Sequence, residues 1–504
     1  TNQRGVEGEG VGVIQADAWH AAGFTGEGLR IGVLDLGFAG YEELLGEDLP
    51  ENVPLKTFGW YDESEVHGTA CAEIVHEVAP GAELVFAWYD GADASFGEAV
   101  EWLLAQDVDI ITHSAGGVIS PRDGTGWDAQ VVDEVVAKGI LWVNSAGNEA
   151  DVHHRGTFTD TDGDGYHEFA PGEEMLAVYM WNYLRIYLLW DDNWTRPTQD
   201  YDLLIVDEDQ NILARADDAQ DGSEGQRPAE WVGIESDESV IYIMVQVYES
   251  DHPVTFDLFV SGPSAEIVAA VPQYSVTAPG DATGALTVGA TEWDDDSLAY
   301  YSSQGPTNDE RLKPEISAPA GVSGATYGPR EFDGTSASTP HVAGAAALVW
   351  QAHPEFSRQQ VVDFLISASR DLGPTGPDTG YGYGRLLLPP PGDEVIPPVT
   401  PGPGPSTTTP SPEVPVTPTS VAFVTPQPTT VLEDDDDEDG GVSLALIGLL
   451  IGGMGLGGMG LLLVSGLLFI RSRRAHQATT QPRPSYIPPP PPPSPQRRAG
   501  PPDA

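Results

Sequence analysis

Short apolar runs alternate with helical patterns over residues 1–150. Four runs are apolar enough to be strands buried on both faces, at 29–35, 83–88, 109–114 and 140–145. Between them, segments 69–78 and 98–105 carry apolar side chains at helical spacing. Because parallel sheets lie between layers of helices, this alternation predicts an α/β domain with a parallel sheet covered on both faces.

The pattern changes near Ala150. Apolar and polar residues then alternate with a partial period of two, between turns that are acidic or contain glycine or asparagine, in the runs 175–190, 200–207, 239–248 and 254–262. A series of such runs without helical spacing is typical of an all-β sandwich. The sequence therefore predicts a β module over residues 151–274.

The α/β pattern returns after this module, over residues 275–388. Apolar strand-like runs are followed there by two segments with helical spacing, at 336–351 and 357–369. The β module is therefore predicted to be inserted between the two parts, 1–150 and 275–388, of one α/β domain.

The C-terminal segments are each typical of a different environment. Residues 389–441 are rich in proline and threonine, end in an acidic run and lack any period, which predicts an extended stalk. The next 29 residues, 442–470, carry no charge, and ~20 apolar residues suffice to cross a bilayer core. Charged residues at both ends of this segment argue against the alternative, a buried glycine-rich helix. A basic, proline-rich tail over 471–504 follows, and its proline content predicts that it is disordered. The positive-inside rule predicts that this tail is cytoplasmic and that the large N-terminal part lies outside.

The charge of the chain and its cysteine content argue against some classes of protein. The chain has 504 residues, with 78 acidic and 22 basic side chains and a net charge of −56, which argues against nucleic-acid binding. Its one cysteine, Cys71, excludes an intrachain disulfide. No signal sequence follows Thr1, so together with the predicted membrane helix we expect the chain to be released from a larger precursor.

Four polar residues stand at the ends of predicted elements. Asp35 ends a strand, His67 opens a helix, Ser336 begins an apolar helix, and Asn148 follows a strand. A serine nucleophile needs a base to take its proton and an acid to orient that base. A helix N-terminus and a side-chain amide can both donate hydrogen bonds to developing negative charge. Taken singly, each residue also fits a structural role, as a cap, a helix start or a turn.

Together and in this order, these segments resemble the subtilase family of serine endopeptidases. The resemblance covers about residues 9–149 and 275–388, and departs at Leu36, Ala70 and Ala337 without removing a catalytic group. It implies a doubly wound α/β fold with a mainly parallel sheet and an activity on protein or peptide substrates. It also implies that Asp35 orients His67, that His67 acts as base and then acid, that Ser336 is the nucleophile, and that Asn148 stabilises the oxyanion. The alternative is a non-catalytic surface adhesion or scaffold protein built on an inactive domain of this family.

The resemblance further implies that two chain segments flank an extended peptide. One wall consists of Ser114, Ala115, Gly116 and Gly117, and the other of Ala146 and Gly147 with Asn148. Because these residues are small and uncharged, we expect a primary pocket for apolar or aromatic side chains. A charged substrate residue would need a counter-charge that the sequence does not locate.

An acidic loop at the start of the β module predicts a structural calcium ion. Oxygen-bearing side chains occupy positions 1, 3, 5 and 9 of a calcium-loop pattern, as Asp160, Asp162, Asp164 and Glu168. Gly165 holds position 6, and the backbone oxygen of Tyr166 is expected at position 7. Position 12 is Pro171, so a further ligand must come from elsewhere, such as Glu173 or Glu174. A plain acidic turn is the alternative. The oligomeric state is not predictable from these patterns.

Overall fold

The computed structural model describes residues 8–60, 62–236, 238–262 and 264–392. The predicted membrane helix 442–470, the tail 471–504 and nearly all of the stalk 389–441 lie outside the described residues. Among the helices of the described part, none combines the length and the apolar composition that crossing a membrane requires.

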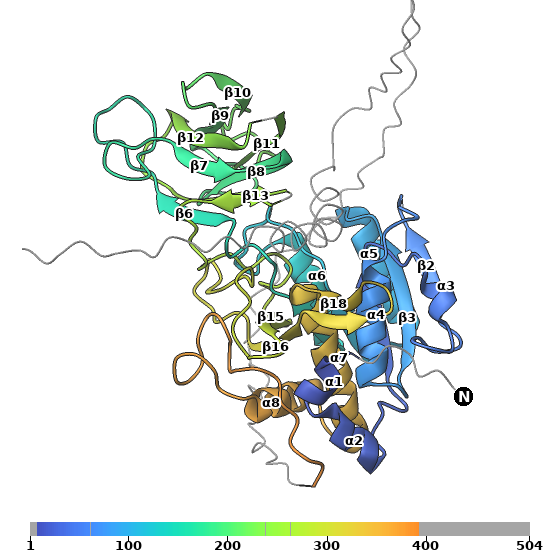
Figure 1. Ribbon diagram of the computed structural model, residues 1–504. Coiled ribbons are helices and arrows are strands. Elements are labelled where there is room, and N and C mark those ends of the chain that lie inside the picture. The colour runs from blue at the N-terminus through green and yellow to red at the C-terminus, as the bar shows by residue number, and fades with distance from the viewer. Residues whose placement is uncertain (1–7, 61, 237, 263, 393–504) are drawn as a thin grey trace, which may run out of the picture.

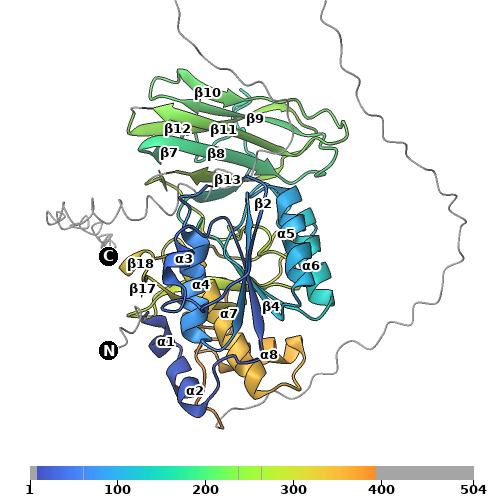
Figure 2. The ribbon, with the colours of Figure 1, turned by 90° about the vertical axis from the view of Figure 1, so that its right-hand side faces the viewer.

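A seven-stranded parallel sheet forms the centre of the larger module (Figures 1 and 2). Its order is β16-β15-β5-β4-β1-β3-β2. The strands are β1 Arg30–Asp35, β2 Leu55–Phe58, β3 Glu83–Tyr89, β4 Ile110–His113, β5 Leu141–Ser145, β15 Leu286–Glu292 and β16 Ile316–Ala320. The predicted α/β fold with a mainly parallel sheet is therefore confirmed, whereas the short edge strand β2 was not foreseen.

Helices cover both faces of this sheet. Viewed edge-on, α4 (His67–Val78) and α7 (Thr335–Ala352) lie on one side, and α5 (Asp93–Ala105) and α6 (Trp127–Ala137) on the other (Figure 2). Within β1, Ile31 and Val33 belong to the apolar core with α4 and α7, whereas Leu34 belongs to the core with α5 and α6. A strand buried on both faces must be apolar throughout, which explains the continuous run that marked it in the sequence. The remaining helices are α1 Gly10–Val13, α2 Ala16–Ala22, α3 Tyr41–Leu44 and α8 Arg358–Ala368.

The β module consists of two antiparallel sheets packed face to face. The four-stranded sheet has the order β11-β8-β13-β6, with β6 His153–Thr157, β8 Asn182–Trp190, β11 Ala229–Ser236 and β13 Thr255–Ser261. The five-stranded sheet has the order β10-β9-β12-β7-β14, with β7 Leu176–Tyr179, β9 Asp200–Val206, β10 Ile212–Ala216, β12 Val240–Glu249 and β14 Glu266–Ile267. Ile186 and Leu188 of β8 meet Leu203 and Ile205 of β9 in a separate core between the sheets. A short hairpin of β17 (Val322–Gly324) and β18 (Gly328–Phe332) precedes α7.

A buried ionic cluster joins the β module to the α/β module. Asp257 of β13 accepts hydrogen bonds from Arg122, which lies in the loop after β4, and from Arg155 and His153 of β6. Arg155 also donates to Asn308 over 2.9 Å, and Arg122 donates to the carbonyl of Tyr274 over 2.6 Å. Burial alone would raise the pKa of Asp257, but Arg122 and its other partners hold that pKa well below its usual range. Removing one partner would leave a buried charge uncompensated, so this cluster holds the two modules in one arrangement.

Candidate active site

The predicted Asp, His and Ser come together at the carboxyl edge of the parallel sheet. Asp35 is the last residue of β1, His67 is the first residue of α4, and Ser336 is the second residue of α7. Clefts at this edge of an open α/β sheet are common binding sites, because loops and helix N-termini converge there.

Asp35 holds the imidazole of His67 in place. The Nδ1 atom of His67 lies 2.8 Å from Oδ1 of Asp35, and the backbone N–H of Leu36 donates to the same oxygen over 2.7 Å. Asp35 is fully buried. Burial alone would lower the pKa of His67, but the Asp35 carboxylate outweighs it and places that pKa well above its usual range. The pair can therefore take up a proton at Nε2 and stabilise the resulting imidazolium.

Ser336 lies at the N-terminus of α7 and is itself buried. Its Oγ donates to the carbonyl of Ser114 over 3.1 Å, and within the described chain no hydrogen bond joins this hydroxyl to His67. Rotation about the side-chain torsion moves a serine hydroxyl between staggered positions, and catalytic hydrogen bonds are often loose before substrate binds. The arrangement can therefore present Ser336 to His67 after one rotation of its side chain.

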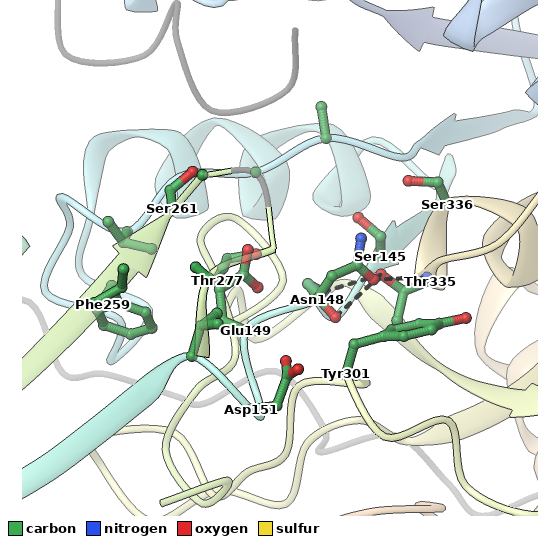
Figure 3. Close-up of a pocket in the computed structure, with 18 of the residues that line it drawn as sticks. Ser145, Asn148, Glu149, Asp151, Phe259, Ser261, Thr277, Tyr301, Thr335 and Ser336 are labelled. Atoms are coloured by element: carbon green, nitrogen blue, oxygen red, sulfur yellow. Dashed lines mark hydrogen bonds between the residues drawn. The ribbon is translucent and has the colours of Figure 1, made fainter. Parts of the chain in front are cut away.

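Asn148 is anchored by one end of its amide. Its Oδ1 accepts hydrogen bonds from the N–H of Thr335 over 2.9 Å and from the Thr335 hydroxyl over 3.1 Å. Gly334 permits this close approach: its φ is +91°, and a Cβ there would lie 3.2 Å from Nδ2 of Asn148. With Oδ1 engaged, the NH₂ group is the free end, on the side of the pocket that carries Ser336 (Figure 3). It can donate to an oxyanion together with the backbone N–H of Ser336.

Cys71 packs beneath these groups. Its Sγ lies 3.9 Å from Nδ1 of His67 and donates to the carbonyl of Ser336 over 3.6 Å. The side chain is 1 % exposed, and burial raises the pKa of its thiol. A protonated, buried thiol acts as a small packing group, in line with the structural role of most buried cysteines.

A pocket of about 160 Å³ opens beside Ser336, and we call it the primary pocket. Ser114, Ala115 and Gly116 line it on one side, and Gly147 and Asn148 line it on the other. The two remaining predicted wall residues do not line it. Ala146 is fully buried, and Gly117 exchanges two backbone hydrogen bonds with Ala278.

The lining of this pocket is not confined to the small, uncharged residues from which a preference for apolar or aromatic side chains was predicted. Glu149 and Asp151 belong to the lining, as does Phe259 of the β module (Figure 3). Tyr187 of the β module is a further lining residue. Burial raises the pKa of Glu149 to about 7 and that of Asp151 to about 6. Glu149 could have been predicted as a pocket residue from the sequence, because it directly follows Asn148. The approach of the β module had no local signal in the sequence.

The predicted calcium loop is only partly assembled. Carboxylate oxygens of Asp160, Asp162 and Asp164 lie within 4.8 Å of one another. Glu168 does not join this cluster, because its Oε1 accepts the N–H of Thr161 over 3.0 Å. Glu174 lies near these carboxylates: slight burial and the charges of Asp164 and Asp162 raise its pKa.

Comparisons with known proteins identify the family of this chain. The family model of the subtilase family matches residues 26–182 and 265–384. Bacillopeptidase F of Bacillus subtilis is 37 % identical over 121 residues, covering 22 % of this chain and 8 % of its own. Subtilisin of Bacillus pumilus is 40 % identical over 90 residues, covering 18 % of this chain and 30 % of its own. The chain thus spans less than a third of the length of either relative.

A solved structure shares the fold. The CspB protease of Clostridium perfringens superposes with a TM-score of 0.53 at 15 % identity, covering 75 % of this chain and 97 % of its own. The family match includes most of both parts of the α/β module and extends over more than half of the residues. The chain belongs to the subtilase family of serine endopeptidases.

Proposed function

We propose that this protein hydrolyses peptide bonds with Ser336 as nucleophile, His67 as general base and acid, and Asp35 as the group that orients His67. The observation that carries the proposal is the 2.8 Å contact between His67 and Asp35, formed at the sheet edge where α7 begins with Ser336. Family membership supports the same chemistry.

The first half of the reaction forms an acyl-enzyme. As Ser336 Oγ attacks the carbonyl carbon of the substrate, His67 takes its proton, and the carbonyl oxygen becomes an oxyanion. The NH₂ group of Asn148 and the backbone N–H of Ser336 stabilise that negative charge. The imidazolium of His67, stabilised by Asp35, then donates its proton to the leaving amine. Water repeats the sequence with His67 as base, which releases the acid product and restores Ser336.

The hydroxyl of Ser336 leaves the Ser114 carbonyl when it turns toward His67. That carbonyl is then free to accept a hydrogen bond from a backbone N–H of the substrate. A bound substrate therefore favours the rotamer of Ser336 that points toward His67. Holding the nucleophile in this alignment lowers the entropic part of the activation barrier.

A non-catalytic adhesion or scaffold role is the alternative, and it is not favoured. An inactive family member would be expected to lack a catalytic group or its support. In this chain Asp35, His67, Asn148 and Ser336 are all present, and Thr335 anchors the amide of Asn148 through two hydrogen bonds.

The proposed location is the outer side of a cell membrane, with residues 442–470 as a single membrane helix and residues 471–504 in the cytoplasm. This part of the proposal rests on the uncharged run and the arginines that follow it. The enzyme would reach soluble or surface proteins.

One labelling experiment tests both activity and location. A membrane-impermeant fluorophosphonate should label the chain on intact cells, because only an activated serine displaces fluoride from phosphorus at a useful rate. Ser336→Ala should abolish the label, and the exposed Ser297→Ala should keep it. Labelling only after lysis would disprove the outward location, whereas no labelling in either state would count against the enzyme.

We further propose that the acidic loop binds a structural calcium ion. Asp160, Asp162 and Asp164 supply clustered carboxylate oxygens, and Glu174 lies near enough to be influenced by two of them. A hard cation favours such a set of oxygen ligands. The ion would offset the mutual repulsion of these carboxylates and fix the loop at the start of the β module.

Chelation should therefore lower the melting temperature of the detergent-solubilised chain by about 2–5 °C relative to excess calcium, since a ligand that binds only the folded state stabilises it. Tryptophan fluorescence follows the transition. Asp162→Asn should shrink the difference, and Asp209→Asn, an exposed acid in the turn after β9, should not. Superimposable melting curves in EDTA and calcium would rule the ion out.

A further inference from the structure

The primary pocket is built by both modules. Phe259 and Ser261 of β13 line the part remote from Ser336 (Figure 3), and Tyr187 of β8 also belongs to the lining. Tyr187 and Phe259 pack with Val118, which follows the Ser114–Gly117 wall of the α/β module. The cluster of Arg122, Arg155 and Asp257 fixes β13 in this position. The inserted module therefore forms part of the surface that a substrate side chain would contact.

Two carboxyl groups, those of Glu149 and Asp151, line this pocket. Oε2 of Glu149 accepts the hydroxyl of Ser303 over 2.9 Å, and a Cβ on Gly147 would lie only 2.2 Å from that oxygen. The carboxyl group of Glu149 is therefore pressed against the backbone that leads to Asn148. Asp151 faces the same pocket two residues further on (Figure 3).

Neither carboxyl group has a cationic partner. Within the described part of the chain, no ion pair includes Glu149 or Asp151. The charge of Arg122 lowers the pKa of Glu149 only slightly against the effect of burial, because Arg122 forms its ion pair with Asp257. Arg155 shares that same carboxylate.

Burial without a cation makes ionisation of these two groups costly. It raises the pKa of both, and the charge of Asp151 adds to the effect on Glu149. A cation entering the pocket would reverse this cost by pairing with them. Tyr187 and Phe259 are each 2 % exposed, so they shape the wall that the β module contributes to the pocket as packed apolar residues.

We propose that the primary pocket selects lysine or arginine at the substrate residue whose carbonyl is attacked, with Glu149 and Asp151 as counter-charges and the β module as the far wall. This inference rests on the proposed peptidase function and names its substrate class. It assigns to the inserted module a part in specificity, through Tyr187, Phe259 and Ser261.

Peptides that differ only at the residue before the cleaved bond test this proposal. We expect the full chain at pH 8, above the pKa of both acids, to cleave after arginine and lysine with kcat/KM about tenfold or more above that for phenylalanine and leucine. Preference for phenylalanine or leucine would overturn the specificity. Cleavage of none of the peptides would instead count against the proposed function.

Variants separate specificity from a merely structural role of the acids. Asp151→Asn should lower kcat/KM for the arginine peptide by about tenfold, a modest loss because the group is only half-buried. Glu149→Gln, which retains an acceptor for Ser303, should act in the same direction. Values for the leucine peptide should stay within about twofold. Glu98→Gln, the same charge change on the exposed surface of α5, should alter neither peptide. An equal loss on both peptides in Asp151→Asn and Glu149→Gln would refute a counter-charge role.

Discussion

Replacing Ser336 by alanine should lower kcat for peptide hydrolysis by a factor on the order of 10⁶, the size of loss measured when the nucleophilic serine of a related serine peptidase is removed. The reason is that no acyl-enzyme can form without Oγ, so His67 has no hydroxyl proton to accept. Residual turnover would come from oxyanion stabilisation and binding alone. Steady-state hydrolysis of a chromogenic peptide measures the effect.

The stability of the Ser336→Ala variant distinguishes lost chemistry from lost folding. The hydroxyl makes one hydrogen bond, to the Ser114 carbonyl over 3.1 Å, so its removal should cost about 1 kcal/mol of unfolding free energy or less. Thermal unfolding checks this, with Ser297→Ala as the control for both assays. Activity within tenfold of the wild type would remove Ser336 from the mechanism.

Replacing Asn148 by alanine should lower kcat by about 10²–10³ while KM changes little. The side-chain amide donates to negative charge that exists only as the oxyanion forms, so its loss destabilises the transition state and not the bound substrate. Pre-steady-state acylation rates on an ester and an amide substrate measure this loss directly.

Asn148→Asp is the matched variant, because it retains the oxygen that accepts hydrogen bonds from Thr335 but replaces the donor by an anion. It should be at least as impaired as Asn148→Ala. If Asn148→Asp retained near-normal kcat, the role of Asn148 would be to anchor Thr335 and α7. A change confined to KM in either variant would place the amide on the ground-state substrate.

The sequence by itself determined the α/β fold and the approximate places of its main elements. Strands such as β1 and β5 are buried on both faces, so their apolar runs are continuous and stand out without any tertiary information. Asp35, His67 and Ser336 could be singled out for a related reason. Each of the three lies at one end of a strand or helix that the local sequence pattern predicts. In a parallel sheet these ends lie along the carboxyl edge, where binding sites are common.

The sequence did not predict helix α6 or strand β6, because neither has a clear apolar period. In α6, paired valines separated by two acids lower helix propensity and obscure the helical period. In β6, the segment His153–Thr157 is polar, and it becomes a strand because His153 and Arg155 meet Asp257 of β13. Such partners lie far apart in the chain, so no local period records them.

Only the tertiary structure decided what the primary pocket contains. Glu149 and Asp151 read as ordinary turn acids in the sequence, and their lack of a cationic partner depends on where Arg122 and Arg155 are engaged. The far wall exists because Phe259 packs on Val118, a contact between residues of two modules. Local patterning specifies which face of a strand is buried, but not which distant surface buries it. The charge and shape of the pocket depend on which distant surfaces pack together, and only the tertiary structure shows this.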